Sequence, residues 1–288
     1  MDNQFTIPQT IWMYWEQGFE NAPLVVKKCV ESWKRLNPEW DIRLLDETSL
    51  TEYVQLDLPE EKISSLLLAH KSDLIRLKLL DAYGGVWADA TTYCMKPLDS
   101  WLNGVSGTGF FAFDRPGPGR LLSNWFLAAE KHNRIISKWH RLLHEFWDRN
   151  TFPKPGRYRQ KLVKRVGLHL NGDCQRTKYW FLPLFTKVFK IYPYAVMHFL
   201  FERLISNDAE SRIIWQKTKK ISADGPHALQ FAGLLTPLSE EHKKLVDESD
   251  APMFKLTYKG FEAGKYPSSL LWYLLEGRDL EQREQAKK

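Results

Sequence analysis

The 288-residue chain has little cysteine and lacks the long apolar runs of membrane-spanning proteins. Its three cysteines, Cys29, Cys94 and Cys174, are odd in number and widely spaced, which argues against a disulfide framework or a zinc module and favours a reducing compartment. No apolar run reaches the roughly 18 residues that a transmembrane helix needs. The N-terminal stretch also lacks the basic and apolar parts of a signal peptide, so we expect a cytoplasmic protein.

Aromatic residues and positive charge are abundant instead. Aromatics make up 14% of the chain, with 12 Trp, and the net charge is +6. Trp and Tyr pack in cores, but their flat faces also stack on sugars and bases. The positive charge suits acidic ligands such as nucleotides, nucleic acid or an anionic membrane surface. A nucleic-acid ligand rests only on the basic pI and scattered aromatics, so we expect no nucleic acid partner.

Strand-like and helix-like segments alternate through the first half of the chain. Strands are expected over 10–15, 40–46, 86–94 and 109–115, and helices over 22–38 and 59–83. This alternation predicts βαβ units, and therefore an α/β fold with a mostly parallel sheet. The second half is expected to be more helical, over 134–147, 177–204 and from 268 to the C-terminus. The Pro-, Gly- and base-rich segment 151–167 is expected to be a flexible loop.

One carboxylate interrupts an otherwise apolar strand in YGGVWADATTYC, residues 83–94. Burying an unpaired carboxylate such as Asp89 costs several kcal/mol, so the residue needs a partner. In open α/β sheets, ligands bind beyond the carboxyl ends of strands, and a carboxylate beside the Thr91 hydroxyl suits Mg²⁺ or Mn²⁺. The alternative is a strand-end Asp that caps the next loop.

A second pair of polar residues lies in the preceding helical segment, HKSDLIRLKLLDAYGG. Asp73 and Arg76 are spaced i, i+3 and share a helical face. On the inner face of a half-buried helix such a pair can hold sugar hydroxyls by charge-assisted hydrogen bonds. The alternative is an intrahelical ion pair on a surface helix, which contributes little.

The joint occurrence of S-D-x-x-R at 72–76 and G-G-x-x-x-D at 84–89 is specific. With IPQTIWMYW and NAPLVVKKCVESWKRLNPEWDIRLLD, it resembles the capsular polysaccharide synthesis glycosyltransferases. That group is related to glycosyltransferase family 32 and more distantly to the glucosylating clostridial toxins. The resemblance is strong over Ile7–Asp99 and implies a GT-A-type, Rossmann-like fold. It implies a single domain over 1–288, with a nucleotide-sugar-binding part at 1–125 and a mostly helical acceptor-side part at 126–288.

The resemblance also implies an activity. It implies transfer of a hexose from a UDP-sugar, with retention and with Mn²⁺ or Mg²⁺, to an oligosaccharide acceptor. We expect that acceptor to be lipid-linked, in capsule or O-antigen synthesis. The alternative is a degenerate carbohydrate- or nucleotide-binding subunit without activity.

Roles for single residues follow from the same resemblance. Asp89 matches the residue that bridges the metal and the nucleotide-sugar, and Asp73 and Arg76 match residues that hold the donor sugar. Trp15 matches an aromatic that stacks on uracil, with a core position as the alternative. Asn124 is expected to help shape the donor site.

The chain departs from the family's D-x-D motif, because Asp-Ala-Thr stands at 89–91. Thr91 is a neutral and weaker metal ligand than a carboxylate. The resemblance suggests His227 as a further ligand, although a lone His is more often structural. Lys255 and Lys259 are candidates to neutralise the leaving diphosphate; the alternative is a pair of solvated lysines.

Basic residues crowd into KPGRYRQKLVKRVG, Lys154–Gly167. Tyr158, Leu162 and Val166 recur there at helical spacing, so the segment could present one apolar stripe. A basic amphipathic segment can lie on an anionic leaflet, which leaves open a peripheral position on the inner face of the plasma membrane. The alternatives are a solvated loop and a loop that folds over the donor diphosphate.

Overall fold

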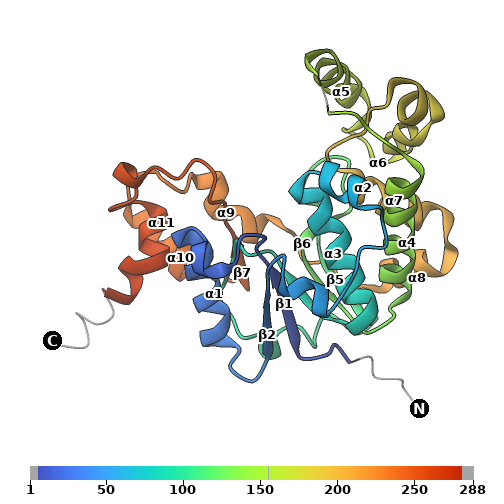
Figure 1. Ribbon diagram of the computed structural model, residues 1–288. Helices are drawn as coiled ribbons and strands as arrows, with labels where there is room; N and C mark the ends of the chain where they lie inside the picture. Colours follow the sequence, from blue (N-terminus) through green and yellow to red (C-terminus); the bar gives the residue numbers. More distant parts are fainter. Residues whose placement is uncertain (1–5, 155, 281–288) are drawn as a thin grey trace. The chain divides into compact units, whose positions relative to one another are not determined.

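A computed structural model describes residues 6–154 and 156–280 (Figure 1). The chain forms two compact units of three segments each. Of the described residues, the first holds 6–12, Thr48–Ala88 and Gly104–Ser222, and the second holds Met13–Glu47, Asp89–Asn103 and 223–280. The single-domain organisation stays a prediction, and the end of the expected C-terminal helix lies outside the described residues.

The first unit is built on buried strands. Strand β3 (Gly85–Ala88) pairs in parallel with β1 (Thr10–Tyr14), with Ile11 opposite Val86. Strand β6 (Leu122–Ala129) runs antiparallel to β3 and to β5 (Phe110–Asp114). The α/β class is confirmed, but these ladders make the sheet more mixed in direction than we expected. The reason is the short connection between β5 and β6, which forces an antiparallel pair.

Helices pack on these strands. Helix α3 (Leu68–Tyr83) packs against α4 (Arg134–Arg149), which packs in turn against α7 (Val196–Asn207) (Figure 1). Helices α2 (Glu60–Ser65) and α8 (Ala209–Lys217) complete this part. Helix α3 stops at Gly84, whose φ of +70° suits glycine, and a Cβ there would lie 2.6 Å from the backbone nitrogen of Lys131. This stop leads directly into β3, so the sequence prediction of the helix end is confirmed.

The basic segment is helical rather than a loop. Helix α5 (Arg157–Leu170) is followed by the short α6 (Cys174–Thr177), a 3-10 helix (Lys178–Phe181) and a π-helix (Leu184–Phe189). Leu162 and Val166 pack against a buried cluster that includes Trp180 and Ile191. The helical spacing is therefore confirmed, but the flexible-loop expectation is wrong from Arg157 onward, because the apolar stripe has its own core to cover. Among the described residues, no helix combines the length and the apolar character needed to cross a membrane.

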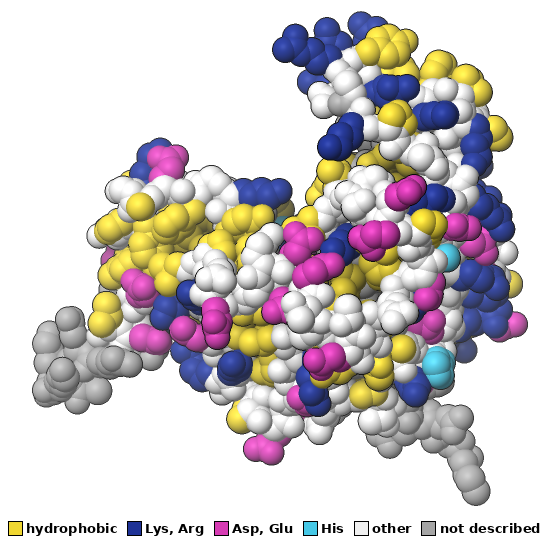
Figure 2. Space-filling view, viewed as in Figure 1, with side chains coloured by type: hydrophobic (Ala, Val, Ile, Leu, Met, Phe, Trp, Pro, Cys, Tyr) yellow, Lys and Arg dark blue, Asp and Glu magenta, His cyan; other side chains and the backbone are white. Residues whose placement is uncertain are grey.

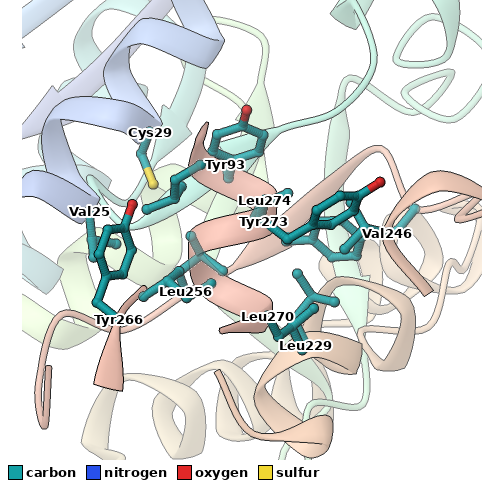
Figure 3. Close-up of a cluster of buried hydrophobic side chains, with 14 residues drawn as sticks. Val25, Cys29, Tyr93, Leu229, Val246, Leu256, Tyr266, Leu270, Tyr273 and Leu274 are labelled. Atoms are coloured by element: carbon teal, nitrogen blue, oxygen red, sulfur yellow. The ribbon is translucent and has the colours of Figure 1, made fainter. Parts of the chain in front are cut away.

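The second unit has its own core. Helix α1 (Leu24–Leu36), strand β2 (Asp41–Leu45) and the antiparallel pair β4 (Thr92–Cys94) and β7 (Met253–Lys255) form one part of it. Helices α9 (Asp224–Ala232), α10 (Glu240–Asp247) and α11 (Leu270–Trp272) form the other. Figure 3 shows their shared apolar cluster, with Cys29, Tyr93, Leu229, Leu256 and Leu274 drawn close together.

Candidate active site

Helix α3 buries the first pair of predicted site residues. Asp73 is 6% exposed and Arg76 is 4% exposed, so they do not form a surface ion pair. Their side chains meet across one helical turn, with Arg76 Nη2 3.5 Å from Asp73 Oδ1. Helix α3 can hold this pair inside because leucine and isoleucine residues occupy the rest of its buried surface: Leu74, Ile75, Leu77, Leu79 and Leu80.

Asn124 on β6 completes this cluster. Its side-chain Nδ2 donates to Asp73 Oδ1 at 2.9 Å, and Arg76 Nη1 donates to the backbone oxygen of Asn124. The Arg76 guanidinium also lies over the ring of Trp87, 5.1 Å from its centroid. The structure therefore brings together all three residues that were predicted to act on the donor sugar. We name them the sugar cluster: Asp73, Arg76 and Asn124.

A buried charged cluster of this kind contributes little to the stability of the fold. Proteins in which apolar side chains of similar volume replace such a cluster are often as stable or more stable. Removing one charge and leaving the other buried is costly, by about 3–5 kcal/mol. The cluster presents a carboxylate acceptor beside guanidinium donors. Such groups bind the hydroxyls of a polar ligand.

The structure divides the expected strand 86–94 into β3 and β4, and Asp89 lies in the turn between them, where its side chain has a cationic partner. Lys255 Nζ lies 3.0 Å from Asp89 Oδ2 and 2.6 Å from Thr91 Oγ1. The side chains of Lys255 and Asp89 are 15% and 26% exposed, so the pair is shielded but open to a ligand. We name these residues the carboxylate cluster: Asp89, Thr91 and Lys255.

Two local features place this cluster. The backbone oxygen of Asp89 accepts from the nitrogen and the hydroxyl of Thr92, at 2.9 and 2.7 Å, and so closes the turn into β4. Thr92 pairs in turn with Lys255 across the β4–β7 ladder. The turn is closed by the backbone of Asp89, and the side chain of Asp89 contacts Lys255.

Trp15 lies beside the carboxylate cluster within the second unit. Its half-buried ring packs against a small cluster that includes Ala22, Val26 and Ala90, the residue between Asp89 and Thr91. The ring meets Tyr258 edge-on, with centroids 5.0 Å apart and planes at 81°. Sequence reasoning missed Tyr258, although an aromatic between Lys255 and Lys259 was a usable signal. The half-buried ring of Trp15 suits a stacking role against a flat ligand.

The remaining predicted residues lie in other surroundings of the second unit. His227 on α9 donates through Nδ1 to the oxygen of Ala223 at 2.8 Å and stacks on Phe231 at 6.0 Å. Lys259 is exposed and lines a cavity of about 290 Å³ with Leu234 and Phe261.

The donor set for a metal ion is small. Across residues 6–154 and 156–280, no three His, Cys, Asp or Glu side chains gather closely enough to hold a metal. Asp89 and Thr91 offer two oxygen ligands in one place. Mg²⁺ commonly binds one or two carboxylates and completes its shell with water and substrate phosphates, so the cluster fits an ion held jointly with a diphosphate.

Comparison with known proteins places the chain in a wider group. Residues 1–154 match the family model described as capsular polysaccharide synthesis protein. An O-glycosyltransferase, braB, of Annulohypoxylon truncatum is 30% identical over 166 residues, covering 51% of this chain and 39% of that protein. The glycosyltransferase afumC of Aspergillus fumigatus is 32% identical over 162 residues, covering 50% of this chain and 41% of that protein.

Among solved structures, the UDP-bound glycosyltransferase domain of the YGT toxin aligns over 95% of this chain and 98% of its own, with 11% identity and a TM-score of 0.41. For the two fungal relatives, braB and afumC, the matched part of this chain spans less than half of each relative's length. The family match, by contrast, covers more than half of the chain and includes the sugar cluster and Asp89. The chain belongs to the capsular polysaccharide synthesis protein family.

Proposed function

We propose that this protein is a retaining glycosyltransferase that moves a hexose from a UDP-sugar to a saccharide acceptor. The observation that carries the proposal is the sugar cluster, a buried ion pair with a side-chain amide bonded to it. A buried ion pair of this kind contributes little to stability, its charged groups can form strong hydrogen bonds with a polar ligand, and the family description points to saccharides. The fungal relatives named as glycosyltransferases support the reaction type.

The sugar cluster would bind the hydroxyls of the donor hexose. Asp73 accepts hydrogen bonds from sugar hydroxyls, while Arg76 donates to their oxygens. The backbone oxygen and the side-chain amide of Asn124 hold the two charges in place. This orientation matters because a hexose is transferred only if its anomeric carbon faces the acceptor hydroxyl.

The carboxylate cluster would act on the nucleotide. Trp15 offers its ring to uracil, and the ammonium of Lys255 neutralises charge on the diphosphate as the bond to the anomeric carbon breaks. A Mn²⁺ or Mg²⁺ ion bound by Asp89 and Thr91 would add positive charge at the same oxygens. The acceptor oxygen bonds to the anomeric carbon, the bond between that carbon and the diphosphate oxygen breaks, the acceptor's proton passes to the departing diphosphate, and UDP leaves. Roles for His227 as a further metal ligand and for Lys259 as a second cation remain proposals.

The acceptor and the pathway are proposed from the family description and the basic surface. The family description supports an acceptor in polysaccharide synthesis, and we propose that it is lipid-linked in a capsule or O-antigen pathway. A GT-A-type domain and a position on the inner face of the plasma membrane suit that acceptor. Basic side chains gather over α5 (Figure 2), as an anionic membrane would require.

A non-catalytic carbohydrate- or nucleotide-binding subunit is the second candidate. It is favoured by one observation, because Lys255 contacts both side chains that would otherwise bind a metal. The two candidates differ in turnover. Incubation with UDP-glucose, UDP-galactose and their N-acetylated relatives, with Mn²⁺ and with EDTA, should release UDP if the protein is an enzyme. Tight binding of a UDP-sugar without release of UDP would favour the subunit.

A further inference from the structure

A cavity of about 280 Å³ opens in the first unit beside α5. One wall comes from the start of α3, with His70, and a second from α5, with Val163. Ile191, Tyr192 and Tyr194 supply a third. Its lining is predominantly apolar, so the cavity suits an apolar group rather than a free sugar or a nucleotide.

Aromatic rings surround His70 at this cavity. The imidazole lies 5.3 Å from the ring of Tyr192, 5.6 Å from that of Tyr194 and 5.1 Å from that of Trp147. Tyr194 itself is 66% exposed. Packed rings of this kind make a rigid apolar wall, and rigid walls bind with little loss of side-chain freedom.

His70 places one polar atom without a described partner, Nδ1, within the aromatic wall of the cavity. The residue is 1% exposed, and its Nε2 donates to the backbone oxygen of Tyr194 at 3.0 Å. Burial lowers the pKa of His70, so the ring is neutral at neutral pH and its Nδ1 is a hydrogen-bond acceptor. Within the described part of the chain this buried Nδ1 has no hydrogen-bond partner. A buried acceptor without a partner is costly, and a ligand hydroxyl would satisfy it.

Three cations border the same cavity: Arg159, Lys164 and Lys190. Lys164 and Lys190 are exposed, and Arg159 donates to the backbone oxygen of Phe189 at 3.4 Å. In the described residues, none of the three forms an ion pair with a carboxylate, whereas many other basic residues of the chain do. Three unpaired cations beside an apolar cavity are the complement of an amphiphile with an anionic group.

The cavity adjoins the sugar cluster along α3. His70 precedes Asp73 by three residues, so the two share a helical face and stand about 4.5 Å apart along the axis. A second link runs through α7, where the Met197 sulfur lies 3.4 Å from Asn124 Nδ2. Tyr194 of the cavity precedes Met197 by three residues. A molecule held in the cavity is therefore placed next to the residues proposed to bind the donor hexose.

We infer that this cavity binds the acceptor, and that the acceptor is an anionic amphiphile. Its apolar part enters the cavity, a hydroxyl donates to His70 Nδ1, and its phosphate or carboxylate contacts Arg159, Lys164 and Lys190. The role as acceptor rests on the proposed function, whereas the binding of the amphiphile does not.

The test uses calorimetric titration of the full chain, without donor, with decyl phosphate below its micelle concentration. Decyl maltoside and inorganic phosphate are the comparison ligands, because they carry the apolar chain and the anion separately. We expect decyl phosphate to bind at least tenfold more tightly than either. Equal binding of decyl maltoside would contradict the anionic part of the inference, and equal binding of inorganic phosphate would contradict the apolar part.

Two sets of variants locate the site. The triple variant R159Q/K164Q/K190Q removes the cavity cations, and R157Q/K161Q/R165Q removes the same charge from neighbouring positions of the chain that do not line the cavity. We expect at least a tenfold loss of affinity in the first and less than a twofold loss in the second. Equal losses would show non-specific attraction and overturn the inference.

Filling the cavity provides an independent check. Val163→Trp should abolish binding of decyl phosphate, while Leu168→Trp, at a position of α5 that is 75% exposed, should not. Circular dichroism confirms that both variants are folded, and retained binding in Val163→Trp contradicts the site. If the amphiphile binds but no UDP-sugar is turned over, the proposed function fails and the binding site stands. If UDP-sugar is turned over but the amphiphile does not bind, the proposed binding site fails and the proposed function stands.

Discussion

Lys255 and Asp89 form a shielded ion pair in the second unit, with 3.0 Å between Nζ and Oδ2. The same ammonium contacts the hydroxyl of Thr91 at 2.6 Å. The carboxylate of Asp89, in the turn between β3 and β4, is thus compensated by a cation from β7. If a nucleotide diphosphate binds here, this cation is already close to the position where negative charge develops.

Asp89→Asn should reduce UDP release from a UDP-hexose at least 100-fold while leaving the fold intact. The amide keeps the size of the side chain but removes the charge that pairs with Lys255 and that would hold the proposed metal ion. The control is Asp250→Asn, which breaks an exposed ion pair with Lys96 and should have no effect. Near-wild-type turnover in Asp89→Asn contradicts the assignment.

Arg76→Ala and Asp73→Ala should abolish sugar transfer but leave UDP affinity nearly unchanged, because the proposed function assigns both residues to the hexose. Each leaves a buried charge without its partner, so each should also lower the free energy of unfolding, by about 3–5 kcal/mol. Urea unfolding and titration with UDP measure the two effects separately. The control is Glu31→Gln, which breaks an exposed i, i+3 pair on α1 and should change stability by less than about 0.5 kcal/mol. A matching fall in UDP affinity would mean that the roles are misassigned.

Trp15→Ala should weaken UDP binding by about 1–3 kcal/mol, the usual contribution of base–aromatic stacking. Trp15→Phe keeps an aromatic face and should lose less. Titration with UDP gives the affinity, and circular dichroism shows that the variants remain folded. Unchanged affinity in Trp15→Ala would leave the ring with a packing role against Ala90 and Tyr258.

The chain should sediment with vesicles of anionic lipid and not with neutral vesicles, and high salt should release it. The quadruple variant R157Q/R159Q/K161Q/K164Q should lose this binding, because each basic residue near an anionic surface contributes about 1 kcal/mol. Leu162 and Val166 pack inward, whereas Tyr158 of the same stripe is exposed, so the charges, Tyr158 and Leu168 remain for the contact. Undiminished sedimentation of the variant would place any membrane contact elsewhere.

Acidification should destabilise the protein partly through His198. Burial, together with the nearby Arg120 and Arg76, lowers the pKa of His198 to about 3. The folded state keeps this ring neutral, whereas the unfolded chain takes up a proton below about pH 6.5. The contribution to stability is therefore complete above pH 6.5 and decreases as the pH falls toward 3. Urea unfolding at pH 7 and pH 5 should differ less in His198→Phe than in the wild type; an identical difference would contradict this.

Local sequence patterns predicted the features that depend only on residues close together in the sequence. The i, i+3 spacing of Asp73 and Arg76 and the glycine stop at Gly84 are properties of one helix, and both are found in the structure. The contact of Lys255 with Thr91 joins residues 164 positions apart and depends on the pairing of β4 with β7, which no local pattern indicates. We expected a flexible loop over most of α5 because Pro153, Pro155 and Gly156 directly precede it, although the helical spacing of Leu162 and Val166 indicated the stripe that packs against Trp180.

Release of UDP from UDP-glucose or UDP-galactose tests the central claim most directly. The wild-type protein is assayed with Mn²⁺ and with EDTA, beside Asp73→Ala as the variant of the sugar cluster. We predict release of UDP by the wild type, a strong reduction in EDTA, and at least a 100-fold loss in Asp73→Ala with UDP binding preserved. Binding of UDP-sugars by the wild type with no release of UDP under any of these conditions would contradict the account.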